Sequence, residues 1–85
     1  MASYSVRFKQ SAAKELERIP FKDRRRIVHR IESLGTAPRP PGCEKLSGEE
    51  KYRLRQGDYR ILYAIVDQAL IVTVVTIGHH RESYR

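Results

Sequence analysis

Four basic side chains in the second half of the chain could act together on a phosphate. Lys51, Arg53 and Arg55 occupy alternate positions of one segment, and Arg60 follows the Gln-Gly-Asp turn at 56–58. Alternate residues of a β-strand share a face, and adjacent antiparallel strands lie about 5 Å apart. We therefore expect Lys51, Arg53 and Arg60 to share one concave face, where their charges would stabilise a reacting phosphate.

The C-terminal segment adds groups that could move protons. Cleavage of RNA by its own 2′-hydroxyl needs a base for that hydroxyl, an acid for the departing 5′-oxygen and positive charge at the phosphorus. His79 and His80 can exchange a proton near neutral pH, and Arg81 adds charge. Tyr84 could stack on a splayed base or orient the phosphate. The alternative interpretation is solvated edge protection for the strand arginines and a merely exposed histidine pair.

The sequence predicts no metal or cofactor site and no membrane contact. His79 and His80 are adjacent, which is a poor spacing for two metal ligands, and no Gly-rich phosphate loop is present. The only cysteine, Cys43, cannot form an internal disulfide. The N-terminal segment lacks the apolar core of a signal peptide, and the longest apolar stretch, 69–78, is far shorter than the roughly 20 residues that span a bilayer. We expect a cytoplasmic location.

The charge balance indicates the kind of partner. Seventeen Lys and Arg oppose ten Asp and Glu, a formal net charge of +7 for 85 residues. This length suits one domain, 1–85, and so small a basic body carries a strongly positive field. The expected partner is a polyanion or an acidic protein, and the alternative is a soluble basic domain without either.

The N-terminal half predicts one strand and two helices. Residues 4–8 alternate apolar and polar side chains, as in a strand with one buried face. Ser11 suits the N-cap of a first helix that ends at Pro20. From Phe21 an apolar stripe predicts a second helix packed beside the first, with Gly35 as a left-handed C-terminal cap. The residues of this stripe are Phe21, Ile27, Val28, Ile31 and Leu34.

The C-terminal half predicts three strands after a proline-rich connector at 36–43. Strands are expected over 51–55, 59–66 and 69–77, joined by short turns. Short turns force antiparallel neighbours, so we expect a two-layer α+β fold in the order β-α-α-β-β-β, with a helical hairpin on an antiparallel-rich sheet. The last two strands are apolar on both faces, which suggests that another chain covers the second face.

Three segments carry a family resemblance: KLSG at 45–48, YRLRQGDYRILY at 52–63 and GHHRESYR at 78–85. Together they resemble the RelE/ParE toxin family of type II toxin-antitoxin systems over nearly the whole chain. In RelE-like toxins the matching positions form a site that cleaves mRNA in the ribosomal A site, without a cofactor, and an antitoxin wraps the toxin and blocks that site. The resemblance implies catalytic roles for Lys51, Arg53, Arg60, His80 and Tyr84, and RNA-binding roles for Arg55, His79 and Arg81.

Other functions stay open at this point. The resemblance implies an endoribonuclease, or mRNA interferase, whose partners are mRNA, the ribosome and a RelB-like antitoxin in a hetero-oligomer. The ParE branch shares the fold but inhibits DNA gyrase without nuclease activity, and a non-catalytic RNA-binding module would also explain the charge. Arg60 together with the histidines and Tyr84 favours the RelE branch.

Two residue roles also stay open. Relatives often carry arginine at the second position after the glycine, so the acid role stays open between His79 and His80. The basic run at 22–26 is either a solvated helix face or a contact for ribosomal RNA or an acidic antitoxin.

Overall fold

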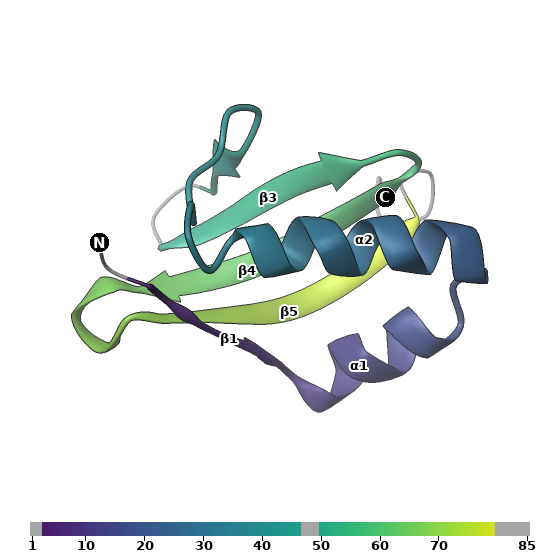
Figure 1. Cartoon of the computed structure of the whole chain (residues 1–85), viewed down its shortest axis with the longest axis horizontal. Helices are drawn as coiled ribbons and strands as arrows, with labels where there is room; N and C mark the ends of the chain where they lie inside the picture. The colour runs from purple at the N-terminus through teal and green to yellow at the C-terminus, as the bar shows by residue number, and fades with distance from the viewer. Residues whose placement is uncertain (1–2, 47–49, 80–85) are drawn as a thin grey trace.

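A five-stranded sheet with two helices on one face makes up the computed structural model, which describes residues 3–46 and 50–79 (Figure 1). The elements are β1 (Ser5–Phe8), α1 (Gln10–Glu17), α2 (Phe21–Ser33), β2 (Glu44–Lys45), β3 (Lys51–Gln56), β4 (Tyr59–Val66), the 3-10 turn η1 (Asp67–Ala69) and β5 (Ile71–His79). The strand order is β1-β5-β4-β3-β2; β1 runs parallel to β5, and the other neighbours are antiparallel. The predicted two-layer α+β fold is confirmed.

Alternation along the central strands decides which side chains meet the helices. Tyr52 and Leu54 of β3 and Ile61 and Tyr63 of β4 are buried, whereas the residues between them are more exposed. The helices and the residues just after them complete the core with Ala12, Ile19, Ile27, Ile31 and Leu34. The hydroxyl of the fully buried Tyr63 donates a hydrogen bond of 2.8 Å to the Pro38 carbonyl, which ties the connector to the core.

Three expectations about the helices were wrong. The first helix begins at Gln10 after an extended Lys9, and no side chain caps it, so Ser11 lies inside the helix. Phe21 is 63 % exposed and does not belong to the buried stripe. Gly35 is not a left-handed cap; a Cβ there would lie 3.2 Å from the Tyr4 carbonyl oxygen, so this glycine permits close approach of the first strand.

The strands also differ from prediction at their ends. β2 was missed, because two residues are too few to show an alternating pattern; it pairs Glu44 with Arg53. β5 begins at Ile71, two residues later than expected, because Leu70 takes the left-handed conformation after the 3-10 turn. β5 then extends to His79 instead of ending at residue 77, which makes His79 a strand residue.

Arg39 fastens the connector to one end of the sheet. Its guanidinium donates hydrogen bonds to both carboxylate oxygens of Asp67, at 3.2 and 2.8 Å, and to the Tyr52 hydroxyl at 2.9 Å. Glu50 accepts a longer bond of 3.4 Å, and the Tyr4 hydroxyl donates to Asp67 at 2.7 Å. Arg39 and Tyr4 hold the pKa of Asp67 below its usual range. The connector therefore has a defined path although it forms no helix.

Candidate functional site

The sheet face turned away from the helices, here called the open face, carries the strand cations. Lys51 lies opposite Ala64, Arg53 opposite Leu62, and Arg55 opposite Arg60 in the β3–β4 register. Directly opposed residues of an antiparallel pair point to the same face. The structure therefore brings Lys51, Arg53, Arg55 and Arg60 onto one face, and the buried Tyr52 and Leu54 between them occupy the other.

Two arginines meet directly across the strands at one end of the open face. Arg55 and Arg60 are register partners beside the tight turn at Gly57, whose backbone is left-handed at φ 60°. Like charges that oppose each other across an antiparallel pair destabilise the sheet. Arg55 donates a hydrogen bond of 3.3 Å to the Gly57 carbonyl, and Arg60 is partly buried. This pairing concentrates positive charge at one end of the open face, which suits an anion bound between the two guanidinium groups.

Arg53 is held by a carboxylate that the sequence analysis did not select. Glu44, its register partner on β2, accepts hydrogen bonds from Arg53 Nε at 3.1 Å and Nη2 at 2.6 Å through the same oxygen. The Arg53 hydrogen bond, and to a lesser degree the charge of Arg60, lower the pKa of Glu44. Glu44 is therefore ionised near neutral pH and lies within the electrostatic reach of both arginines. No signal in the sequence pointed to it, because β2 itself was not predicted.

His79 lies on the opposite face from the arginines. It is the register partner of Tyr59, whose ring packs against the core on the helix side. The two rings form an edge-to-face pair with centroids 5.3 Å apart. Beside them, the Glu15 carboxylate accepts the Ile77 backbone N–H at 2.9 Å, so this end of β5 is attached to α1. His79 thus does not share a site with Arg60. The predicted residues His80, Arg81 and Tyr84 lie outside the described residues.

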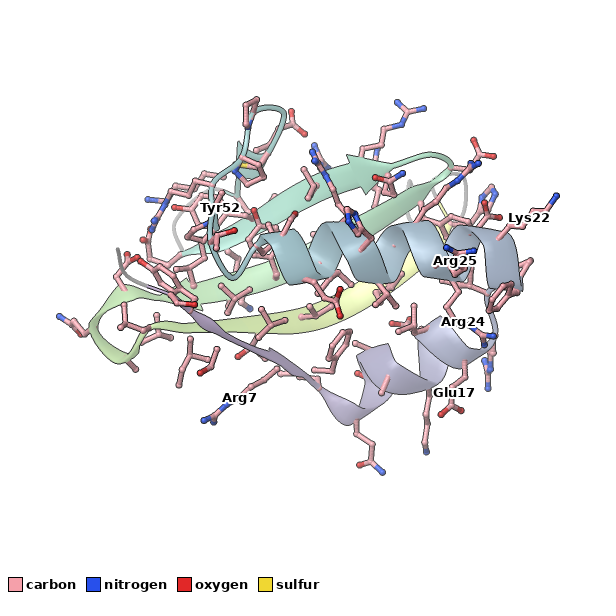
Figure 2. The ribbon with its side chains drawn as sticks, in the orientation of Figure 1. Arg7, Glu17, Lys22, Arg24, Arg25 and Tyr52 are labelled. Carbon is pink, nitrogen blue, oxygen red and sulfur yellow. The ribbon has the colours of Figure 1, made fainter. Side chains whose placement is uncertain are left out.

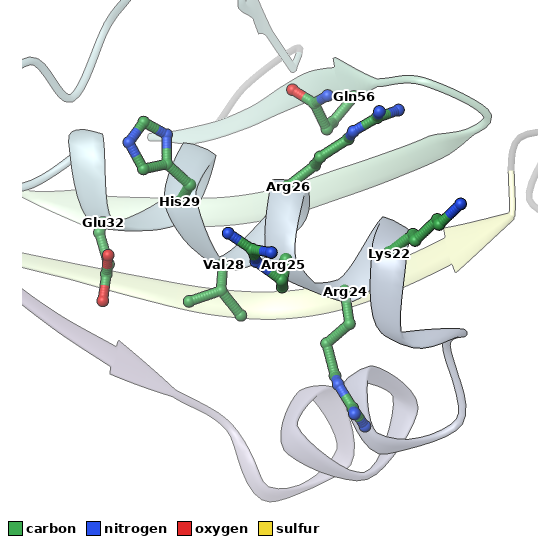
Figure 3. Close-up of a pocket in the computed structure, with 8 residues that line it drawn as sticks. All are labelled: Lys22, Arg24, Arg25, Arg26, Val28, His29, Glu32 and Gln56. Atoms are coloured by element: carbon green, nitrogen blue, oxygen red, sulfur yellow. The ribbon is translucent and has the colours of Figure 1, made fainter.

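A second basic surface occupies the helix layer. Lys22, Arg24 and Arg25 gather at the N-terminal end of α2, while Tyr52 and the Arg39 contacts lie toward the other end of the molecule (Figure 2). With Arg26 and His29 they line an open depression that extends to the end of β3 (Figure 3). The ion pairs of the described residues lie elsewhere, around Arg39, Lys45 and Arg53.

Residues 3–46 and 50–79 contain neither a cluster of metal ligands nor a membrane-spanning helix. In that part of the chain no three His, Cys, Asp or Glu side chains gather closely enough to hold a metal ion. Neither described helix has the length and apolar character that crossing a bilayer requires. Cys43 is a partly buried free thiol among the described residues.

The arrangement of a helix pair on one face of a five-stranded sheet is shared with small toxins of known structure. The family model described as the ParE toxin of the type II toxin-antitoxin system parDE matches residues 6–84. The chain belongs to this RelE/ParE family of toxins.

Individual relatives come from the RelE side of the family. An Escherichia coli protein described as RelE-like toxin is 28 % identical over 83 residues, which cover 94 % of this chain and 86 % of the relative. The RelBE2 toxin-antitoxin complex of Mycobacterium tuberculosis contains a chain with 28 % identity and a TM-score of 0.81, covering 91 % of this chain and 98 % of that one. Escherichia coli RelE, solved as a double mutant with a RelB peptide, gives 26 % identity and a TM-score of 0.75, covering 100 % and 97 %. The family description and the relatives' names point to different branches, so the choice of activity depends on the site.

Proposed function

We propose that this toxin is an endoribonuclease that cleaves mRNA in the ribosomal A site and thereby inhibits translation. The observation that carries the proposal is the convergence of Arg53, Arg55 and Arg60 on the open face. In the proposed reaction the 2′-hydroxyl loses its proton to solvent as its oxygen attacks the adjacent phosphorus, and the bond from phosphorus to the 5′-oxygen breaks as that oxygen takes up a proton. The products are a 2′,3′-cyclic phosphate and a 5′-hydroxyl. Fixed guanidinium groups stabilise the extra negative charge of this transition state, and the step needs no metal ion.

Arg60 has the central role in this scheme. It directly opposes Arg55 and is the diagonal neighbour of Arg53, so both other guanidinium groups can reach a phosphate that Arg60 holds. Lys51 lies four residues from Arg55 along β3 and suits a neighbouring phosphate of the same strand. Glu44 orients Arg53 until the phosphate arrives.

Proton transfer requires a different group, because arginine keeps its proton in proteins. Since His79 faces the helix layer, we assign the acid for the departing 5′-oxygen to His80. Tyr84 is proposed to stack on a splayed base or to orient the phosphate, and Arg81 to bind the RNA backbone. These assignments rest on the resemblance to RelE-like toxins.

We propose a RelB-like antitoxin as the protein partner, in a cytoplasmic hetero-oligomer. The relatives from Mycobacterium tuberculosis and Escherichia coli were solved with their RelB antitoxins. The +7 charge suits an acidic segment, and Val66 and Leu70, exposed at the β4–β5 turn, offer apolar contacts. If a neighbouring acidic protein neither co-purifies with the toxin nor relieves its toxicity, this partner is wrong.

Inhibition of DNA gyrase is the second candidate, because the matching family model is described as ParE. In vitro translation in parallel with a gyrase cleavage assay separates the two. We expect mRNA fragments that end in a cyclic phosphate and no gyrase-dependent DNA breaks. DNA breaks with intact mRNA would move the chain to the ParE activity, and neither product would leave a binding module.

A further inference from the structure

We infer that the exposed ridge of α2, formed by Lys22, Arg25, Arg26 and His29, binds the phosphate backbone of a folded RNA at a second site, separate from the strand that is cleaved. This inference rests on the proposed function in that both take RNA as the target. The ridge residues are exposed and follow the spacing i, i+3, i+4, i+7, which places them on one side of the helix. The buried Ile27 and Ile31 face the core from the other side.

The charges of the ridge lower the stability of the helix. Its neighbouring cations are three or four residues apart, the spacing at which like charges destabilise a helix. Lys22, Arg24 and Arg25 also lie in the first turns, where the positive end of the helix dipole disfavours cations. Within the described residues, none of these side chains forms an ion pair with a carboxylate. Helix stability therefore does not explain why these cations lie together. A bound polyanion would offset both the repulsion between them and their unfavourable interaction with the helix dipole.

The shape and chemistry of the ridge favour RNA over an acidic peptide. From Lys22 to His29 the helix rises by about 10 Å, and a nucleic-acid strand presents a phosphate about every 3.4 Å along its axis, so about three phosphates face the ridge. Phe21 is 63 % exposed at one end, and the guanidinium groups of Arg24 and Arg25 lie 5.7 and 5.9 Å from its ring centroid. An exposed aromatic ring flanked by guanidinium planes is a stacking surface for an unpaired base.

The ridge is too far around the molecule to serve the cleavage site itself. It projects from the helix layer, whereas Arg53 and Arg60 lie on the opposite face of the sheet. The two surfaces approach each other at the end of β3, where Gln56, the residue after Arg55, lines the depression beside Arg26 (Figure 3). A folded RNA on the ridge could therefore hold the toxin while a separate strand enters the open face.

The test measures binding of a labelled RNA hairpin to the full-length protein over a range of KCl concentrations, in an Arg60→Ala background that avoids cleavage. The ridge variant is Arg25→Gln/Arg26→Gln. The matched control is Lys9→Gln/Lys14→Gln, which removes the same charge from exposed residues outside α2. Glutamine keeps the helix propensity, and circular dichroism verifies the fold.

We expect the ridge variant to bind the hairpin about tenfold more weakly at moderate salt and to lower the slope of log affinity against log salt by roughly 1.5, as for two lost phosphate contacts. The control variant should change the hairpin affinity and the salt slope much less. Phe21→Ala should weaken binding to a hairpin with an unpaired loop more than to a blunt duplex.

Three results decide the inference separately from the proposed activity. Hairpin binding that depends on the ridge, in a protein that never cleaves mRNA, supports the second site and overturns only the nuclease. Equal hairpin affinity in the ridge variant and the control overturns the second site even if cleavage is intact. Loss of the co-purifying acidic antitoxin, with RNA binding unchanged, would show that the ridge binds protein and would also overturn it.

Discussion

The two basic surfaces of this toxin differ in how their charges are held. On the open face, Arg53 is held by the Glu44 carboxylate and Arg55 by the Gly57 carbonyl. On α2 the ridge residues Lys22, Arg25 and Arg26 are exposed, and within the described part of the chain none of them has an acidic partner. A fixed guanidinium can match the geometry of one reacting phosphate, whereas solvated cations attract any phosphate backbone. The same residue types therefore suit catalysis on one surface and attachment on the other.

The largest effect is expected from Arg60→Ala. The substitution should reduce cleavage of ribosome-bound mRNA by about 100-fold to 1,000-fold, because a group that stabilises developing charge is lost. The melting temperature should change little, since Arg60 is a partly exposed strand residue opposite Arg55, and charged contacts at such positions contribute little to stability. Single-turnover cleavage measures the rate, and thermal unfolding measures the melting temperature.

The ridge variant Arg25→Gln/Arg26→Gln is the control from the helix layer, and its cleavage rate should stay unchanged at saturating ribosome concentration. A folded Arg60→Ala protein with full toxicity would remove this residue from the mechanism.

The next largest effect separates the two histidines. His80→Gln should slow cleavage by about 100-fold, the usual size of one acid-base function, and should flatten the pH profile near neutrality. His79→Gln should leave the rate within a few-fold, because its ring packs on Tyr59 in the helix layer. Ribosome binding by both variants serves as the control. If His79→Gln had the larger effect on rate, the assignment of the acid would be reversed.

A smaller effect is expected at Glu44. Glu44→Gln keeps a hydrogen-bond acceptor for Arg53 but removes a negative charge that opposes the incoming phosphate. We expect the KM for ribosome-bound mRNA to fall a few-fold with a smaller change in kcat. Arg53 lowers the pKa of Glu44, so protonation of this carboxylate should reproduce the effect of Glu44→Gln only at pH values below the usual pKa range of a glutamate. A kcat loss of 100-fold or more would instead make Glu44 a catalytic base.

The smallest effect concerns stability at the Arg39 contacts. Arg39→Ala should lower the melting temperature by only about a few degrees, since partly exposed ion pairs contribute little. The pKa of Asp67 is lowered in the folded protein, so the stabilisation is present above the pKa of the unfolded carboxylate and is lost as pH falls through the folded value. Thermal unfolding at pH 7 and pH 3 should show the difference between wild type and Arg39→Ala narrowing at acid pH. An unchanged difference would assign the effect to packing.

Strong local patterns predicted most of the fold. Alternation in β3 and β4 placed Lys51, Arg53 and Arg60 on one face correctly, because side-chain period in a strand is fixed by the backbone. Tertiary contacts decided the exceptions. Gly35 allows the backbone of Tyr4 to approach closely. The prediction that Phe21 is buried was wrong, because α2 turns its first residue away from the core.

The site was predictable only in part. His79 was grouped with the basic residues because the last strand was expected to end before it; two further strand residues instead place His79 beside Tyr59. Glu44 was missed because its contact with Arg53 depends on the pairing of β2 with β3. A strand of two residues is too short to be predicted from the sequence. Alternation was enough to group the strand cations, whereas cross-strand register was needed to separate His79 from them and to find Glu44.

The central claim is that the open face catalyses attack of a 2′-hydroxyl on mRNA. The most direct test is single-turnover cleavage of ribosome-bound mRNA that carries one 2′-deoxy substitution at the nucleotide cleaved in the unmodified message. The account predicts that the substitution abolishes cleavage at that bond, while ribosome binding stays unchanged and the unmodified message yields a 2′,3′-cyclic phosphate end. Cleavage of the deoxy-substituted bond at the normal rate would contradict the account, because the nucleophile would then come from elsewhere.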